Sequence, residues 1–337
     1  MRSILRWFFA SVAGLVIAGC SPAPSVVGRI EIPLYVGEIA VGNDAVWLRQ
    51  VGSGRPGPIR GPGAVLRLDP KLKQIVARIP LRVSNFAGGI AVGERDVWVT
   101  EGSDGENVIR IDATTNEIVA TIPLGKDPRA VAVGEGAVWV HAFTTIYRID
   151  PRTNEVVYWI PIWANVALAV GPNAVWLTNH LGGKVARIDP RTNAIVATIP
   201  VAPNPRDILV GEDVVWILHT AFGTHPQPSY LSRIDPATNK VLGEPIRVGD
   251  WAHVLLGGKY LWIGSLGKLS RIDPKTLQKV GEPIQIKPFI SRLAFGLDSV
   301  FALSVFADPA VRPTVIHQIR QRTIWDRILE FIGLSSS

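Results

Sequence analysis

The chain has 337 residues, of which 47% are hydrophobic and 19% are charged, and its formal net charge is +7. Its single cysteine excludes a fold held by internal disulfides, and the absence of a dense Lys/Arg run with interleaved aromatic residues argues against a nucleic-acid partner. The mild positive charge favours contact with anionic lipid or polysaccharide.

Residues 1–19 predict a lipoprotein signal peptide. Arg2 and Arg6 form a basic start, and the apolar run that follows, over residues 7–17, is shorter than a membrane-spanning helix. The run ends in Ile-Ala-Gly-Cys, which resembles the lipobox of bacterial lipoproteins and places the lipid on Cys20. An ordinary signal peptide with a coincidental cysteine is the alternative.

Residues 20–25 contain the lipidated Cys20 and a short tether, so the domain that follows is expected to sit close to the bilayer. Ser21 rather than Asp follows the cysteine, which by resemblance to known sorting rules favours the outer membrane. The expected location is therefore the bacterial cell envelope, with the protein anchored by lipid and facing the periplasm.

Residues 26–321 contain a repeat of about 40 residues, which is typical of a β-propeller. Each unit has a Gly at the end of its first strand and an aromatic residue five positions later. The glycines are Gly42, Gly93, Gly134, Gly171, Gly211, Gly257 and Gly296. The aromatic residues are Trp47, Trp98, Trp139, Trp176, Trp216, Trp262 and Phe301. These two markers predict an all-β, seven-bladed propeller of four-stranded antiparallel blades.

A second motif, Arg-Ile-Asp-Pro, ends the third strand of several units, as at residues 148–151. Asp, Pro and the Asn that follows are residues typical of hairpins, so the repeated Asp and Arg are interpreted as structural. Seven aromatic residues at one blade position are likewise interpreted as packing between neighbouring sheets.

The two ends of the repeat region predict a closed ring. The last unit has a first, a second and a weak third strand, around residues 315–319, but no convincing fourth. Residues 27–33 resemble the fourth strand of the other units, so they are predicted to complete blade seven and to leave no open sheet edge.

Residues 322–337 alternate apolar and charged side chains at roughly helical spacing and predict an amphipathic helical tail. The tail either packs under the propeller or makes a second contact with the membrane or a partner.

Candidate functional residues lie after the second strands and before the first strands, because these loops share one face of a propeller. The first group includes Arg49, Glu101, His141, Asn179, His180 and His219. The second group includes Glu38, Arg129, Arg206, Asp207, His253 and Arg292. Arg55 and Arg60 lie in the enlarged loop 51–63.

Histidines and carboxylates on one face can hold a divalent metal or carry out acid–base chemistry. His180 and His219 are the candidate metal ligands, and Glu101, His219 and His253 are the candidate catalytic residues. Mg²⁺ is the cofactor expected if the protein is an enzyme, and no cofactor is expected otherwise. Because no fixed metal-binding spacing occurs, ordinary solvated loop residues are the alternative.

With the repeat laid out, the chain resembles YVTN/NHL-type propellers and, within them, the virginiamycin B lyase-like family. The resemblance covers residues 26–320 and rests on units such as 128–139 and 185–190. For the characterised lyases it implies the opening of a streptogramin lactone by elimination, with a divalent metal, His and Glu. Residues 98–101, Trp-Val-Thr-Glu, are close to that family's Trp-Phe-Thr-Glu, whereas the other six units diverge.

The function expected first is that of a non-enzymatic, lipid-anchored envelope propeller that binds or scaffolds a protein or glycan partner. The expected contact face comprises Arg49, Arg55, Arg60, Arg129, His141, Asn179, His180, Arg206, Trp251 and Arg292. A metal-assisted lyase, lactone-opening like the resembled family, or a hydrolase is the alternative. A redox or quinone-cofactor propeller is a third hypothesis, for which no cofactor motif is recognisable.

Overall fold

The computed structural model describes residues 23–33, 35–52, 63–71, 73–82, 88–103, 105–162, 167–221, 225–257, 259–287, 289–305 and 313–320. Over these ranges the chain forms strands and turns without a helix, and so offers no helix long and apolar enough to cross a membrane. The predictions for the signal peptide, Cys20, Arg55, Arg60 and the C-terminal tail lie outside the described residues.

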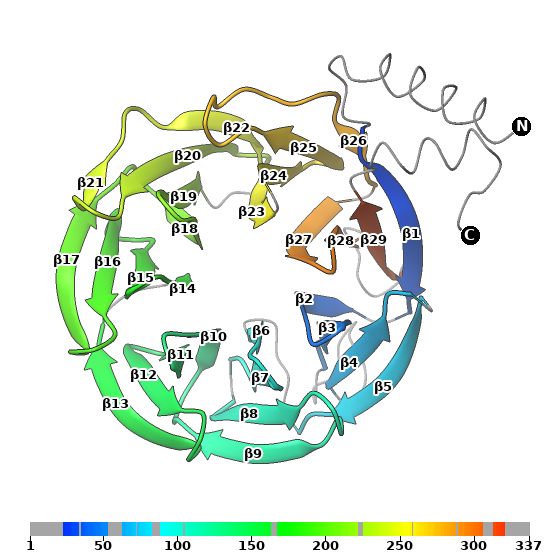
Figure 1. The fold of residues 1–337 in the computed structure, drawn as a ribbon, viewed down its shortest axis with the longest axis vertical. Coiled ribbons are helices and arrows are strands. Elements are labelled where there is room, and N and C mark those ends of the chain that lie inside the picture. The colour runs from blue at the N-terminus through cyan, green and yellow to red at the C-terminus, as the bar shows by residue number, and fades with distance from the viewer. Residues whose placement is uncertain are drawn as a thin grey trace, which may run out of the picture.

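Antiparallel sheets stand side by side around a central axis and form a closed ring (Figure 1). The seven-bladed β-propeller predicted from the repeat is confirmed. Blade 1 has β2 (Val36–Gly42), β3 (Ala45–Gln50), β4 (Ala64–Asp69) and β5 (Gln74–Pro80). Blade 2 has β6 (Ile90–Val92), β7 (Asp96–Thr100), β8 (Asn107–Asp112) and β9 (Ile118–Pro123). Blade 3 has β10 (Pro128–Gly134), β11 (Ala137–Ala142), β12 (Thr145–Asp150) and β13 (Glu155–Pro161).

The remaining blades follow the same order from the axis outward. Blade 4 has β14 (Leu168–Gly171), β15 (Ala174–Asn179), β16 (Lys184–Asp189) and β17 (Ala194–Pro200). Blade 5 has β18 (Pro205–Val210), β19 (Val215–Thr220), β20 (Pro228–Asp235), β21 (Lys240–Val241) and β22 (Ile246–Asp250). Blade 6 has β23 (His253–Gly257), β24 (Tyr260–Ser265), β25 (Lys268–Ile272) and β26 (Ile284–Gln285). Blade 7 has β27 (Phe289–Gly296), β28 (Ser299–Val305), β29 (Thr314–Arg320) and β1 (Ser25–Ile32).

Blade 7 takes its outer strand from the other end of the chain. Strand β1 pairs antiparallel with β29, from Ser25 opposite Arg320 to Ile32 opposite Thr314. The predicted closure of the ring by the N-terminal strand is therefore confirmed. With β1 as its outer strand, blade 7 has four strands, as most of the other blades do.

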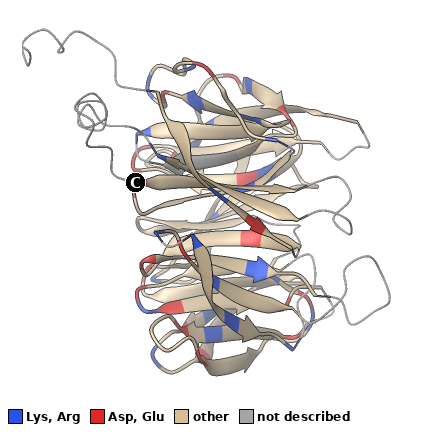
Figure 2. Cartoon of the chain, turned by 90° about the vertical axis from the view of Figure 1, so that its right-hand side faces the viewer, with Lys and Arg blue, Asp and Glu red and all other residues tan. Residues whose placement is uncertain are grey.

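The blades present two faces, which Figure 2 shows from the side. The turns from first to second strand and from third to fourth strand form one face, here named the turn face. The links from second to third strand and from one blade to the next form the other, named the connector face. The inner strand of each blade begins at the connector face and ends at the turn face, so the first residues of these strands line the channel beside the connector face.

Neighbouring blades are joined by a repeated Arg–Trp–Asn arrangement. The arginine two residues before the end of the third strand stacks over the tryptophan of its own blade and donates a hydrogen bond to the turn asparagine of the next blade. Arg67, Arg110, Arg148 and Arg187 lie 5.3–5.4 Å from the ring centroids of Trp47, Trp98, Trp139 and Trp176. Their acceptors are Asn116, Asn154, Asn193 and Asn239, at 2.8–3.1 Å. The structural interpretation of the repeated Arg and Trp is confirmed.

The repeated Asp also has a structural role. In the turn of blade 3, Asp150 Oδ1 accepts the backbone N–H of Arg152 at 2.8 Å, and Asn154 adopts a left-handed conformation with φ 63°. Blades 4 and 5 repeat this turn at Asp189 and Asp235. The Asp carboxylates thus accept hydrogen bonds from backbone N–H groups of the turn that have no partner in the strand ladder.

The outer edges of blades 5 and 6 differ from the single fourth strand that the sequence predicts. In blade 5, β20 pairs first with β21 and then with β22, with a Leu-Gly-Glu-Pro segment between them. Gly243 has φ 65° in this segment, and Gly281 has φ 65° at the corresponding place in blade 6. A left-handed Gly followed by Glu-Pro interrupts the ladder in both blades.

Candidate functional site

Seven equivalent positions encircle the channel, each four residues before the Gly that ends an inner strand. Strand register supports the equivalence, because Glu38 and Arg292 both pair with the residue two places after their blade's aromatic marker. The seven positions hold Glu38, Gly89, Ala130, Ala167, Asp207, His253 and Arg292 in blade order. Blades 5, 6, 7 and 1 are consecutive around the ring and carry all the titratable members (Figure 1). We name Asp207, His253, Arg292 and Glu38 the charged arc.

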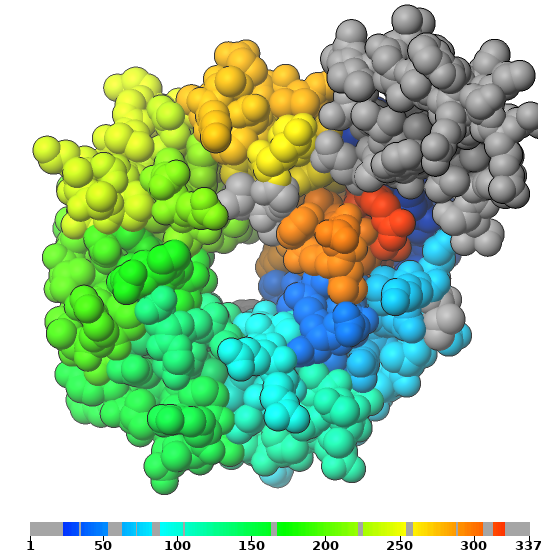
Figure 3. Space-filling view, in the orientation of Figure 1, coloured from blue at the N-terminus to red at the C-terminus, as the bar shows by residue number. Residues whose placement is uncertain are grey.

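The centre of the ring is open when viewed along its axis (Figure 3). The side of the channel formed by blades 2, 3 and 4 has only Gly89, Ala130 and Ala167 at the equivalent positions. Gly89 is required there, because a Cβ would lie 2.8 Å from the Arg129 backbone oxygen. At these seven positions the ring is therefore chemically two-sided, with ionisable side chains on one arc and small side chains on the other.

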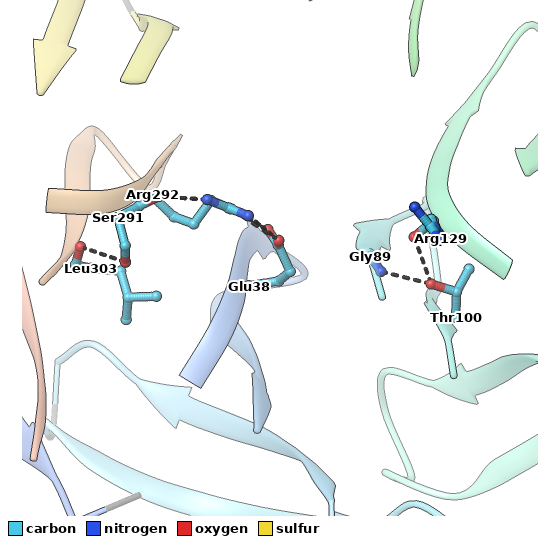
Figure 4. A network of polar contacts seen from close by, with 7 residues as sticks. All are labelled: Glu38, Gly89, Thr100, Arg129, Ser291, Arg292 and Leu303. Atoms are coloured by element: carbon cyan, nitrogen blue, oxygen red, sulfur yellow. Dashed lines mark hydrogen bonds and ion pairs between the residues drawn. The ribbon is translucent and has the colours of Figure 1, made fainter. Parts of the chain in front are cut away.

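Arg292 and Glu38 form the strongest contact of the charged arc (Figure 4). The guanidinium Nε lies 2.9 and 2.8 Å from the two carboxylate oxygens, and Nη2 lies 2.7 Å from Oε1. Nη1 donates to the Ser291 carbonyl at 2.7 Å. The Glu38 carboxylate raises the pKa of Arg292, so the guanidinium stays ionised. It ties blade 7 to blade 1, where the ring closes.

Asp207 and His253 complete the arc, and both titrate far from their ordinary range. Burial raises the pKa of Asp207 to about 6, although the charges of Arg292 and Arg206 oppose the rise. Burial, together with the charges of the same two arginines, lowers the pKa of His253 to about 3. At pH 7 the histidine is neutral, and the aspartate loses its negative charge just below that pH.

Two further arginines predicted for the contact face lie at the starts of inner strands. Arg206 precedes Asp207 and is exposed. Arg129, on blade 3, forms an ion pair with Asp127 at 2.6 Å, and its side chain is 39% exposed. Its backbone oxygen accepts a hydrogen bond from Thr100 Oγ1 at 2.7 Å (Figure 4). Trp251 is half-buried two residues before His253, and its backbone N–H donates to the Gln227 carbonyl at 2.9 Å.

The residues predicted from the ends of the second strands have a different environment, because most of them are buried. Arg49 is 0% exposed, and its Nε and Nη2 donate to the backbone oxygens of Thr100 and Glu101 at 3.1 and 2.8 Å. A Cβ on Gly88 would collide with the guanidinium. The expectation of Arg49 as a surface contact is corrected by this burial: its side chain joins blade 1 to blade 2.

Glu101, the proposed acid–base residue, is also buried. Its Oε2 accepts hydrogen bonds from the backbone N–H groups of Glu106 and Asn107 at 3.0 and 3.1 Å, and from the Asn107 side chain at 2.9 Å. Three donors on one carboxylate oxygen hold the link between β7 and β8 closed.

The two candidate metal ligands contact the same blade-to-blade connector. His219 Nδ1 lies 3.1 Å from the Pro203 carbonyl oxygen, and His180 is hydrogen-bonded to the backbone of Pro205. A carbonyl oxygen only accepts, so Nδ1 of His219 carries the proton, and Nε2 has no hydrogen-bond partner within the described chain. Burial lowers the pKa of both histidines.

The other predicted residues of this group are similarly placed within the blades. His141 is buried at 2% exposure opposite Ala130, and Asn179 is half-buried and accepts the Gly182 N–H at 2.8 Å. Across the described residues, His, Cys, Asp and Glu do not gather in any group of three that could hold a metal ion. The predicted catalytic and metal roles gain no support from these placements and stay predictions.

The sequence placed Glu38 and Asp207 beside the inner strands without including them among the expected contact residues. Strand register identifies them, because the residues four positions before each Gly marker include every member of the charged arc. The burial of Arg49, Glu101, His180 and His219 had no such signal, since polar residues in a loop are ordinarily exposed.

No family model and no curated protein matches this chain in sequence. Solved structures do match in fold. The structure of U3-55K aligns with a TM-score of 0.66 over 88% of this chain and 100% of its own, at 12% identity. Hydrazine synthase from Kuenenia stuttgartiensis aligns with a TM-score of 0.52 over 73% of this chain and 79% of that chain, at 14% identity. At these identities the likeness establishes the β-propeller fold alone.

Proposed function

We propose that this protein is a binding or scaffold module, held at the bacterial envelope by lipid on Cys20, that engages a protein or glycan partner at its connector face. The propeller fold supports a generic binding or scaffold role. The observation that carries the proposal is the charged arc, which occupies four consecutive blades beside that face.

A blade of this propeller can be built without an ionisable side chain at this position. Three other blades have Gly89, Ala130 and Ala167 at the equivalent positions, in or just before the inner strand. Placing ionisable groups in a partly dry channel costs free energy, as the raised pKa of Asp207 shows. Ionisable groups kept at a cost to stability are typical of functional sites.

The chemistry of this region suits a polar partner. The arc and its neighbours offer charges of both signs, a neutral imidazole and the half-buried rings of Tyr35 and Trp251. Arg206 and Arg292 are accessible, the latter with 41% of its side chain exposed. Sugar hydroxyls and polar protein side chains both find donors and acceptors in such a mixture.

The test is site-specific photo-crosslinking in the native membrane. A photoreactive residue replaces Arg206 on the connector face or, as the matched control, Arg152 on the turn face, whose side chain is 88% exposed. We expect a discrete adduct from position 206 that disappears with Arg292→Gln, and none from position 152. Equal adducts from both positions, or none from position 206, would reject the connector face as the contact surface.

The tether is tested separately by Cys20→Ser, which we expect to move the protein from the membrane to the soluble fraction. The metal-assisted lyase or hydrolase stays an alternative hypothesis without an observation of this kind in its favour. Its own test is a thermal-unfolding scan with chelator and then with Mg²⁺, in which a saturable rise in midpoint that His219→Ala removes would support it.

A further inference from the structure

Both ends of the described chain lie at the same corner of the turn face. Ser25 begins β1 and pairs with Arg320, which ends β29. This pair corresponds to Glu155 opposite Asp150 in blade 3, which flank a turn of the turn face. Cys20 lies five residues before Ser25, so its Cα can be no more than about 18 Å from this corner.

The exposed charges of the turn face are unevenly distributed around this corner. Blades 6, 7 and 1, which surround this corner, carry mostly basic residues, and the other four blades carry mostly acidic ones. The first set is Lys71, Lys73, Lys259, Lys275, Lys279 and Arg320, with Asp44, Glu282 and Asp298. The second set is Arg95, Arg152, Arg191 and Lys240, with Glu94, Glu117, Glu135, Glu155, Glu212, Asp213 and Glu244.

Exposed apolar side chains lie at the same corner. Val26 and Val27 on β1 are 40% and 39% exposed, and Ile75 and Val76 on β5 are 40% and 48% exposed. Strands β1 and β5 are neighbours on the outside of the ring (Figure 1). The Lys73 side chain connects the two, since its Cε lies 3.6 Å from where a Cβ on Gly28 of β1 would stand.

We infer that this corner, formed by the turn-face ends of blades 6, 7 and 1, rests on an anionic bilayer, so that the connector face points away from the membrane. The inference rests on the lipid tether of the proposed function. Apolar side chains flanked by lysines are the chemistry that binds the interface of an anionic bilayer. The acidic blades opposite are repelled by the same surface, so the propeller stands tilted on the corner.

Apolar exposure alone does not select the corner, because other outer strands have it too. Ile195 and Val196 on β17 of blade 4 are 43% and 53% exposed and occupy the positions of Ile75 and Val76. What distinguishes the corner is the start of the tether and the local excess of lysine. This equivalence also provides a matched control.

The experiment places a fluorophore at the two equivalent sites. Cys20 is the chain's only cysteine, so once it carries lipid a new cysteine is the sole free thiol. Val76→Cys and Val196→Cys of the full chain are labelled with an environment-sensitive dye. Each is reconstituted into vesicles of phosphatidylethanolamine and phosphatidylglycerol that contain a headgroup-level nitroxide lipid. We expect several-fold stronger quenching at position 76 than at position 196.

The charge is tested in the same vesicles. Lys71→Glu with Lys73→Glu is expected to reduce quenching at position 76, whereas Arg152→Glu with Arg191→Glu leaves it unchanged. In vesicles of phosphatidylcholine the lysine variants are expected to have a much smaller effect.

The failures are distinguishable. Protein that floats with the vesicles but shows equal quenching at both positions, or quenching at neither, overturns the orientation and leaves the tether standing. Quenching at neither position on vesicles, with crosslinks from position 76 to another protein in native membranes, would make the corner a protein interface instead. Protein that does not float at all overturns the tether itself, and with it this inference.

Discussion

Two sets of polar residues lie at the connector end of the blades, on adjacent strands, and have opposite relations to the fold. Arg49, Glu101 and His219 at the ends of second strands are buried and bind backbone groups of links and connectors. In the charged arc, at the starts of inner strands, the side chains of Arg292 and Glu38 instead bind each other between adjacent blades 7 and 1. The first set satisfies backbone groups where the strand ladder ends, which every blade needs in some form. The second set has no charged counterpart at the equivalent positions of blades 2, 3 and 4, and we propose that it serves a partner.

The largest effect on stability is expected where the buried set crosses between blades. Arg49→Met leaves the Thr100 and Glu101 carbonyls without their charged donor, so we expect the free energy of unfolding to fall by about 3 kcal/mol in urea titrations. Arg152→Met, at an exposed turn, is the matched control and should leave the free energy of unfolding essentially unchanged. If the Arg49→Met variant is stable but no longer binds the protein's partner, Arg49 would have to be assigned to the contact surface.

Glu101→Gln is the next largest test and separates a structural from a catalytic carboxylate. The amide keeps the shape but loses the charge that three N–H donors share, so we expect a loss of about 1–2 kcal/mol in the same titration. Crosslinking from position 206 should be unchanged. Unaltered stability combined with loss of binding or of lactone opening would contradict the structural role.

The comparison also shows how much of the fold and of the site can be predicted from the sequence. Seven Gly and seven aromatic markers predicted the blades, and the β-branched run at residues 27–33 predicted the closure, because strand period and turn chemistry are local. Arg49 and Arg292 are equally charged and both lie beside turn-rich segments, yet one is 0% exposed and the other has 41% of its side chain exposed. That difference depends on which blade lies next to each side chain, and only the assembled ring determines it.

Asp207 offers a pH-dependent test of the charged arc. Burial raises its pKa to about 6 in the fold, where the charged groups around it are Arg206, Arg292 and Glu38, so the folded state binds a proton that the unfolded chain has already released. Stability contributed by this group is therefore present below pH 4 and is lost as the pH rises to about 6. Asp207→Asn removes the loss, and we expect the variant to be more stable than the parent by about 1 kcal/mol at pH 8. At pH 4 the two should unfold at the same urea concentration; a gain of equal size at both pH values would place the cause elsewhere.

The smallest expected effect is the coupling between Glu38 and Arg292. Both side chains retain access to water, at 21% and 41% exposure, so a double-mutant cycle with Glu38→Gln and Arg292→Gln should give about 1 kcal/mol or less, decreasing with added salt. The same variants should nevertheless abolish the adduct from position 206. A contact that contributes little to folding and much to binding is the signature expected of the arc. Suppose instead that the coupling energy exceeded the loss of stability caused by Arg49→Met, and that the variants left the adduct intact. The arc would then belong with the buried set, as part of the ring closure.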